Sequence, residues 1–137
     1  MDGVARTLLL DTGPLVAFLD RRDVYHRWAH ERFANTYSPL LTCESVISEA
    51  CFLTRGIPSG NESVLRLWEQ GIVLVPFSMQ QELTTVLALV QRYRNVPLSF
   101  ADACLVRMSE LVDDCAVLAL DNAFRVYRRH GRKRSRG

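Results

Sequence analysis

The stretch LLLDTGPLVAFL, residues 8–19, places an acidic side chain directly after a short apolar run. Residues 7–10 are bounded by charge, which is typical of a buried strand, and Pro14 suits the first turn of a following helix. Asp11 is therefore expected at the carboxyl end of that strand. Four roles are open for it: the Asp-Thr-Gly of an aspartic protease, a phosphoryl-accepting aspartate, a metal ligand, or a helix N-cap.

Outward from this stretch, short apolar runs alternate with helical patterns. Further strands are expected at residues 39–42, 72–77 and 116–120, and helices at 23–36, 43–54, 59–70, 79–93, 99–112 and 121–129. Non-alternating strands separated by helices predict an α/β fold, a three-layer α/β/α domain with a central, mainly parallel sheet. Ligands of such sheets bind beyond the carboxyl ends of the strands, where Asp11 and Asp121 are both expected.

Composition indicates one compact domain, because 137 residues that are 48% hydrophobic can form a single sizeable core. The net charge of +2 conceals seven basic residues within residues 125–137; the rest of the chain carries ten basic and fifteen acidic residues. We expect residues 128–137 to be a basic, disordered C-terminal tail. Four scattered cysteines without a C-x-x-C pair favour a reduced, cytoplasmic protein, and no segment resembles a signal peptide or a membrane span.

Two more acids interrupt apolar helical surfaces: Glu49 in VISEACFL and Asp102 in LSFADACLV. A carboxylate at the edge of a buried surface is costly to leave without a partner. The nearest basic residues, Arg55 and Arg107, are not at the three- or four-residue spacing that favours helical ion pairs. A divalent cation would supply the missing charge, and Mg²⁺ and Mn²⁺ prefer carboxylate oxygens.

Each acid also has a purely structural interpretation. Ser99 and Asp102 fit a capping-box variant, and Asp121 and Asp11 can each be a helix N-cap. Glu49 can be an ordinary solvated acid. The four together point to a metal site more strongly than any one of them does.

These residues resemble the PIN-domain nucleases, especially the bacterial and archaeal VapC-type toxins. The likeness rests on four blocks in order: LLLDTGPLVAFLD, LLTCESVISEACFL, LSFADACLV and AVLALDNAF. It implies a single PIN-like nuclease domain over residues 1–127, with Asp11, Glu49, Asp102 and Asp121 as catalytic acids that bind Mg²⁺ or Mn²⁺. It places Thr12 where it would hold Asp11 or a metal-bound water. It also implies RNA as substrate, an antitoxin partner and a homodimer.

The chain departs from the family pattern near the fourth acid. Ala119 is at a position where the family often has a hydroxyl residue, and Ala123 is where it often has a further acid. The number of metal ions bound, one or two, is therefore left open. An aspartic protease needs an all-β fold, whereas most of this chain has helical patterns. A phosphoryl-accepting aspartate usually has a second acid two residues later, and this chain has Gly13 at that position. The resemblance therefore implies a divalent-metal-dependent endoribonuclease and, as a finer expectation, the toxin of a toxin-antitoxin pair. The alternative is a weak or inactive RNA-binding or partner-binding module of the same fold.

Overall fold

The computed structural model describes residues 6–120 and, for the backbone alone, residues 125–127 and 133–135. Four strands form the central sheet: β1 (Thr7–Leu10), β2 (Leu40–Leu41), β3 (Val73–Leu74) and β4 (Cys115–Leu118). Their order is β3-β2-β1-β4, and all three pairings are parallel. The predicted parallel sheet is confirmed, although β2 and β3 are shorter than the apolar runs that contain them.

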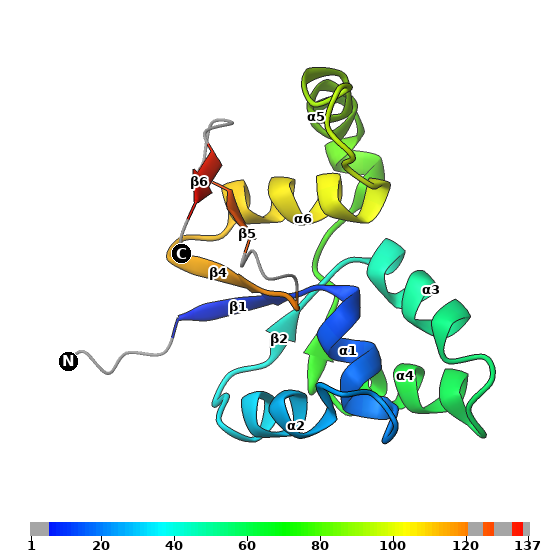
Figure 1. Ribbon diagram of the computed structural model, residues 1–137. Helices are drawn as coiled ribbons and strands as arrows, with labels where there is room; N and C mark the ends of the chain where they lie inside the picture. Colours follow the sequence, from blue (N-terminus) through cyan, green and yellow to red (C-terminus); the bar gives the residue numbers. More distant parts are fainter. Residues whose placement is uncertain (1–5, 121–124, 128–132, 136–137) are drawn as a thin grey trace.

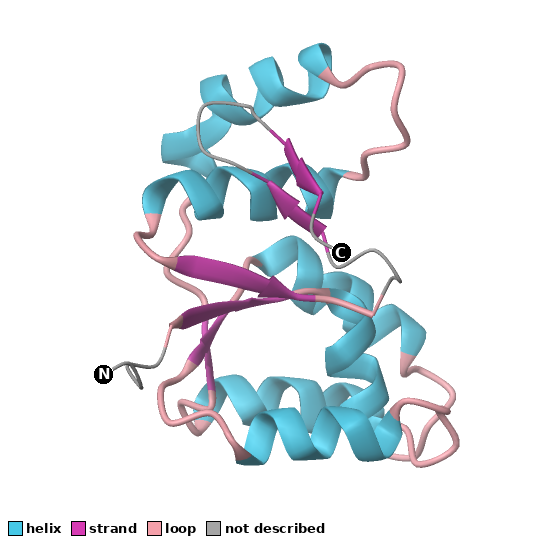
Figure 2. Cartoon of the chain, turned by 60° about the vertical axis from the view of Figure 1, so that its left-hand side comes forward, coloured by secondary structure: helices cyan, strands magenta, loops and turns pink. Residues whose placement is uncertain are grey.

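Six helices connect these strands: α1 (Thr12–Leu19), α2 (His26–Ala34), α3 (Glu44–Leu53), α4 (Gly60–Glu69), α5 (Met79–Arg92) and α6 (Phe100–Leu111). Helices α5 and α6 lie on one side of the sheet, and α1, α2 and α4 lie on the other (Figures 1 and 2). Helix α3 lies near the carboxyl ends of the strands and contacts both α1 and α6. This is the expected three-layer arrangement. It brings α3 next to both α1 and α6 near the carboxyl ends of the strands.

The central strand β1 lies in the middle of the hydrophobic core. Leu9 and Leu10 are fully buried, as is Leu15 of α1. The buried Thr42 hydroxyl donates a hydrogen bond of 2.7 Å to the carbonyl of Leu10. On the other side, the backbone N–H of Asp11 donates to the carbonyl of Leu118 at 3.1 Å. Two hydrogen bonds therefore fix the end of β1, one to Thr42, which follows β2, and one to Leu118, the last residue of β4.

Helix α5 is joined to α6 by a partly buried ion-pair cluster. Arg107 of α6 contacts Glu82 of α5 at 2.6 Å and Glu110 of its own helix at 3.1 Å. The hydrogen bond with Glu82 raises the pKa of the Arg107 guanidinium. None of the described helices is long and apolar enough to cross a membrane.

Two expectations at element ends were wrong. The helix expected over 121–129 is contradicted at residues 125–127, which form β5 (Arg125–Tyr127) and pair antiparallel with β6 (Lys133–Ser135). Val126 and Tyr127 are strong strand formers, and β6 supplies a hydrogen-bonding partner that the local pattern could not reveal. Part of the segment expected as a disordered tail is thus a strand. Helix α2 begins at His26 because Asp23 instead forms a turn, accepting from the N–H of Tyr25 at 2.8 Å.

Gly60, the first residue of α4, has no room for a side chain. A Cβ atom there would lie 2.1 Å from the carbonyl oxygen and 2.9 Å from the Cβ of Thr54, which is fully buried. We expect Gly60→Ala to lower the free energy of unfolding by about 1 to 3 kcal/mol, as overpacking usually does. Urea denaturation measures this change.

Gly56→Ala is the matched control, because a Cβ at Gly56 meets nothing within 4 Å. It should change the urea midpoint little. Equal midpoints for the two variants would show that α4 can shift away from Thr54 at no cost.

Candidate active site

Asp11 lies at the point where β1 ends and α1 begins. Its backbone is extended and its Oδ1 accepts a hydrogen bond of 2.7 Å from the N–H of Thr12, so it is the N-cap of α1. The side chain is half-buried. Asp11 therefore has the predicted place at the carboxyl edge of the sheet, and it also has the predicted capping role.

Thr12 connects α1 to α3. Its buried hydroxyl donates to Oε1 of Glu49 at 3.0 Å. Thr12 thus contacts two of the predicted acids, Asp11 through its backbone N–H and Glu49 through its hydroxyl, and its expected role beside Asp11 or a metal-bound water stays a prediction. Glu49 is exposed, as its solvated interpretation required, yet its carboxylate has a defined position.

Asp102 forms a capping box at the start of α6. Its backbone N–H donates to the Ser99 hydroxyl at 3.0 Å, and its Oδ2 accepts from the N–H of Ser99 at 3.2 Å. The structural interpretation of this acid is confirmed. The capping box also fixes the direction of the carboxylate at the end of α6 that faces α3.

The donor set suits a hard cation, because aspartate and glutamate oxygens are ligands that Mg²⁺ and Mn²⁺ prefer. The structure links Asp11, Thr12 and Glu49 in one arrangement and places Asp102 at the start of α6. Within residues 6–120, however, no group of three His, Cys, Asp or Glu side chains has a geometry ready to hold a metal ion. Asp121, the fourth predicted acid, lies outside the described residues.

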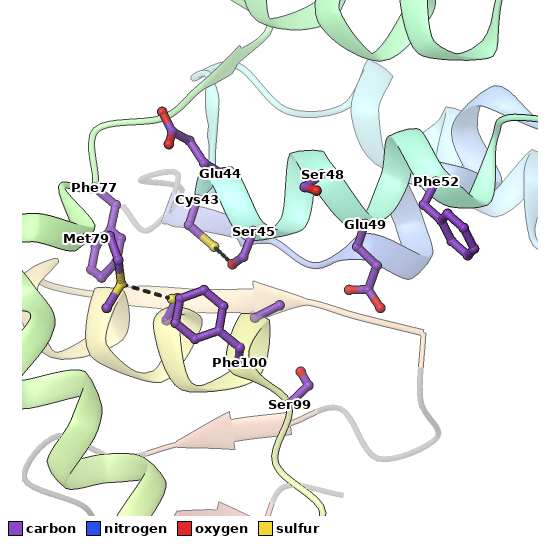
Figure 3. A pocket seen from close by; sticks show the side chains of 12 residues that line it. Cys43, Glu44, Ser45, Ser48, Glu49, Phe52, Phe77, Met79, Ser99 and Phe100 are labelled. Atoms are coloured by element: carbon purple, nitrogen blue, oxygen red, sulfur yellow. Dashed lines mark hydrogen bonds between the residues drawn. The ribbon is translucent and has the colours of Figure 1, made fainter.

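A pocket of about 750 Å³ opens between α3 and the start of α6 (Figure 3). Glu49 and Ser99 both line it, so the pocket adjoins Asp102 as well as the Thr12–Glu49 pair. The rest of its lining escaped sequence reasoning and consists of serines, apolar side chains and one further acid: Cys43, Glu44, Ser45, Ser48, Phe52, Phe77, Met79, Phe100, Ala101 and Cys104. A signal existed for Phe52, which follows Glu49 by three residues and so shares its helix face.

Two of the cysteines, Cys43 and Cys104, line this pocket. Cys43, the N-cap residue of α3, has its sulfur 3.1 Å from the Ser45 hydroxyl. A hydrogen bond with Cys104, opposed by burial and helped by Ser45, lowers the pKa of the Cys43 thiol to about 7. The same bond raises the pKa of Cys104. None of the four cysteines forms a disulfide with another, and the proximity of two core thiols at this pocket was not predicted from the sequence.

The chain is similar in sequence to a known family and similar in fold to a solved structure. The family model of the PIN domain matches residues 8–129. The crystal structure of VapC20 from Mycobacterium tuberculosis, described as a sarcin-ricin loop cleaving toxin, superposes with a TM-score of 0.68 at 18% sequence identity. The likeness covers 84% of this chain and 92% of VapC20 and establishes a shared fold. No curated protein matches the sequence.

The Cys43 thiol should react at neutral pH if its thiolate is stabilised as described. We expect its alkylation by iodoacetamide to follow a titration whose midpoint lies below that of an ordinary thiol, because the thiolate is the reacting form. Mass spectrometry of labelled peptides between pH 5 and pH 9.5 measures the midpoint. Cys104→Ala should move it upward, since the largest stabilising hydrogen bond is removed.

Cys51 is the internal control, because burial raises the pKa of its thiol. Its labelling should stay slow throughout the neutral range. A Cys43 midpoint that is the same with and without Cys104 would show that the two thiols do not interact.

Proposed function

This chain belongs to the PIN domain family, and from that membership we infer that it is a divalent-metal-dependent endoribonuclease that hydrolyses RNA phosphodiester bonds. The observation that carries the proposal is the hydrogen-bonded arrangement of Asp11, Thr12 and Glu49 at the carboxyl edge of the sheet. RNA as the substrate is supported by VapC20, which is described as a toxin that cleaves the sarcin-ricin loop.

Asp11, Glu49 and Asp102 would hold the cation, Mg²⁺ or Mn²⁺, and Asp121 would be the fourth acid. Such an ion polarises the phosphodiester and lowers the pKa of a bound water. The acids thus serve as ligands and need not attack the RNA themselves. Neither a histidine nor a lysine is required as a general acid or base.

The chain's own contribution is to orient these carboxylates before any cation arrives. The N–H of Thr12 fixes Asp11, the hydroxyl of Thr12 fixes Glu49, and the Ser99 backbone fixes Asp102. Carboxylates so placed repel one another and repel RNA phosphates at short range. Both repulsions would be relieved if these carboxylates held a cation, so acids at this edge suit a metal-dependent nuclease.

The finer features of the proposal concern partners. We infer a toxin that an antitoxin protein inhibits and that forms a homodimer, with residues 1–127 as one nuclease domain. The basic residues of the tail, 128–137, would recruit the RNA backbone through salt-dependent contacts.

A second function has one observation in its favour. Since the described residues contain no group of three side chains ready to hold a metal, the protein could instead be a module that binds RNA or a protein partner without cleaving RNA. The same variants distinguish the two functions.

We expect Asp11→Asn, Glu49→Gln and Asp102→Asn each to lower the rate of Mn²⁺-dependent RNA cleavage by at least about 100-fold, because each removes a charged ligand. Calorimetric titration should show Mn²⁺ binding to the wild-type protein and its loss in the variants. RNA binding, measured by a gel shift, should largely remain.

Glu31→Gln is the matched control, since Glu31 is an exposed acid of α2 that does not line this pocket. It should leave cleavage within about twofold of wild type. An Asp11→Asn protein that still cleaves fully would refute the ligand assignment. RNA binding by a wild type that neither binds Mn²⁺ nor cleaves would establish the module.

Thr12 should affect metal affinity through Glu49. Thr12→Val removes the hydroxyl that holds Oε1, and loss of a residue that orients a ligand typically weakens metal binding about 10- to 100-fold. Thr12→Ser keeps the hydroxyl and should keep wild-type affinity for Mn²⁺. Equal Mn²⁺ affinities for the two variants would mean that the hydrogen bond does not position Glu49 for the ion.

A further inference from the structure

Two phenylalanines are exposed at the same pocket. Phe52 is 60% exposed and Phe100 is 52% exposed, whereas the other described phenylalanines are buried or half-buried. Both line the pocket between α3 and α6, which Glu49 also lines. Exposed aromatic side chains that gather beside a site, and do not scatter over the surface, indicate contact with a ligand.

The two rings come from different elements and flank the acid. Phe52 lies in the last turn of α3 and Phe100 is the first residue of α6. In Figure 3, Glu49 lies between them with its carboxylate directed away from α3. Hydroxyls of Ser45 and Ser48 lie along the same wall of the pocket. The pocket therefore combines aromatic rings with hydrogen-bonding groups.

A positive charge is held at the edge of this pocket. The guanidinium of Arg55 lies 3.8 Å from the centroid of the Phe52 ring and donates to the Phe52 carbonyl at 2.6 Å. These contacts fix Arg55 next to an aromatic wall of the pocket. A guanidinium in that position suits a phosphate group that leads into the pocket.

The chemistry of the lining selects the kind of ligand. A free phosphate would meet Glu44 and Glu49, so a neutral group fits the interior better. A nucleobase is neutral, has flat faces that stack on aromatic rings, and carries N–H groups that carboxylate and hydroxyl oxygens accept. The volume of about 750 Å³ falls within the range of ordinary ligand pockets.

We propose that this pocket binds one unpaired base of single-stranded RNA, stacked against Phe100 and Phe52, with the adjoining phosphate at Arg55. This subsite rests on the proposed ribonuclease function and adds the positioning of the substrate to it. Phe100 and Phe52 are then binding residues that set which phosphodiester reaches Asp11 and Glu49. A stacked base next to the acids would favour loop or single-stranded RNA over a duplex, because the bases of a duplex are already stacked and paired.

The test uses a 12-nucleotide unstructured RNA with phosphorothioate linkages, which resist hydrolysis, and 2-aminopurine at alternating positions. With Mg²⁺ present, binding to the wild-type chain should quench the 2-aminopurine fluorescence. Phe100→Leu should weaken the affinity about tenfold and abolish the quenching, because a leucine side chain offers no flat face on which a base can stack. Phe100→Tyr keeps an aromatic ring and should retain both.

Leu87→Ala is the control, since Leu87 is 53% exposed on α5 and does not line the pocket. Unchanged affinity and quenching in both Phe100→Leu and Phe52→Leu would overturn the proposal. That result is also the one expected if the pocket instead binds an apolar peptide side chain of a protein partner. Quenching of the phosphorothioate RNA, with no cleavage by the wild type of the same RNA carrying ordinary phosphodiester linkages, would defeat the nuclease and leave the base subsite. Cleavage with no effect of either substitution would do the reverse.

Discussion

The position of the carboxyl end of β1 is the constraint on which the site depends. Leu10 is held from one side by the Thr42 hydroxyl, and Asp11 is held from the other by the carbonyl of Leu118. A parallel strand buried on both faces has little freedom to slip, because a shift of one residue would move its side chains to the opposite faces. The direction in which α1 leaves the sheet is thereby fixed, and with it the location of Thr12.

From this point the arrangement of charges follows. Thr12 reaches Glu49, so the first turn of α1 and the middle of α3 share one polar contact at the carboxyl edge. The nearest basic residues along the chain have other partners: Arg107 pairs with Glu82 and Glu110, and Arg55 stacks on Phe52. The charges of α5 and α6 thus stabilise helix packing away from the acidic edge.

The sequence predicted most of the fold because its signals are local. Apolar runs marked the four sheet strands, and the Ser99–Asp102 spacing identified a capping box that the structure contains. Contacts between distant segments left no such trace. The direction of the Thr12 hydroxyl, the Cys43–Cys104 pair and the exposed rings of Phe52 and Phe100 depend on how α3 packs near α6. The strand at 125–127 likewise depends on a partner six or more residues away.

Capping and metal binding, which the sequence left as alternatives, are compatible roles for the same acids. An N-cap or capping box contributes only about 1 kcal/mol, and it does so by holding a carboxylate in one rotamer at a helix start. A ligand present at 100 times its dissociation constant stabilises the folded state by about 2.7 kcal/mol. The hydrogen bonds of Asp11 and Asp102 are therefore weak enough to yield to a cation and sufficient to orient the acids until it binds. Helix starts at a sheet edge supply this orientation without additional residues.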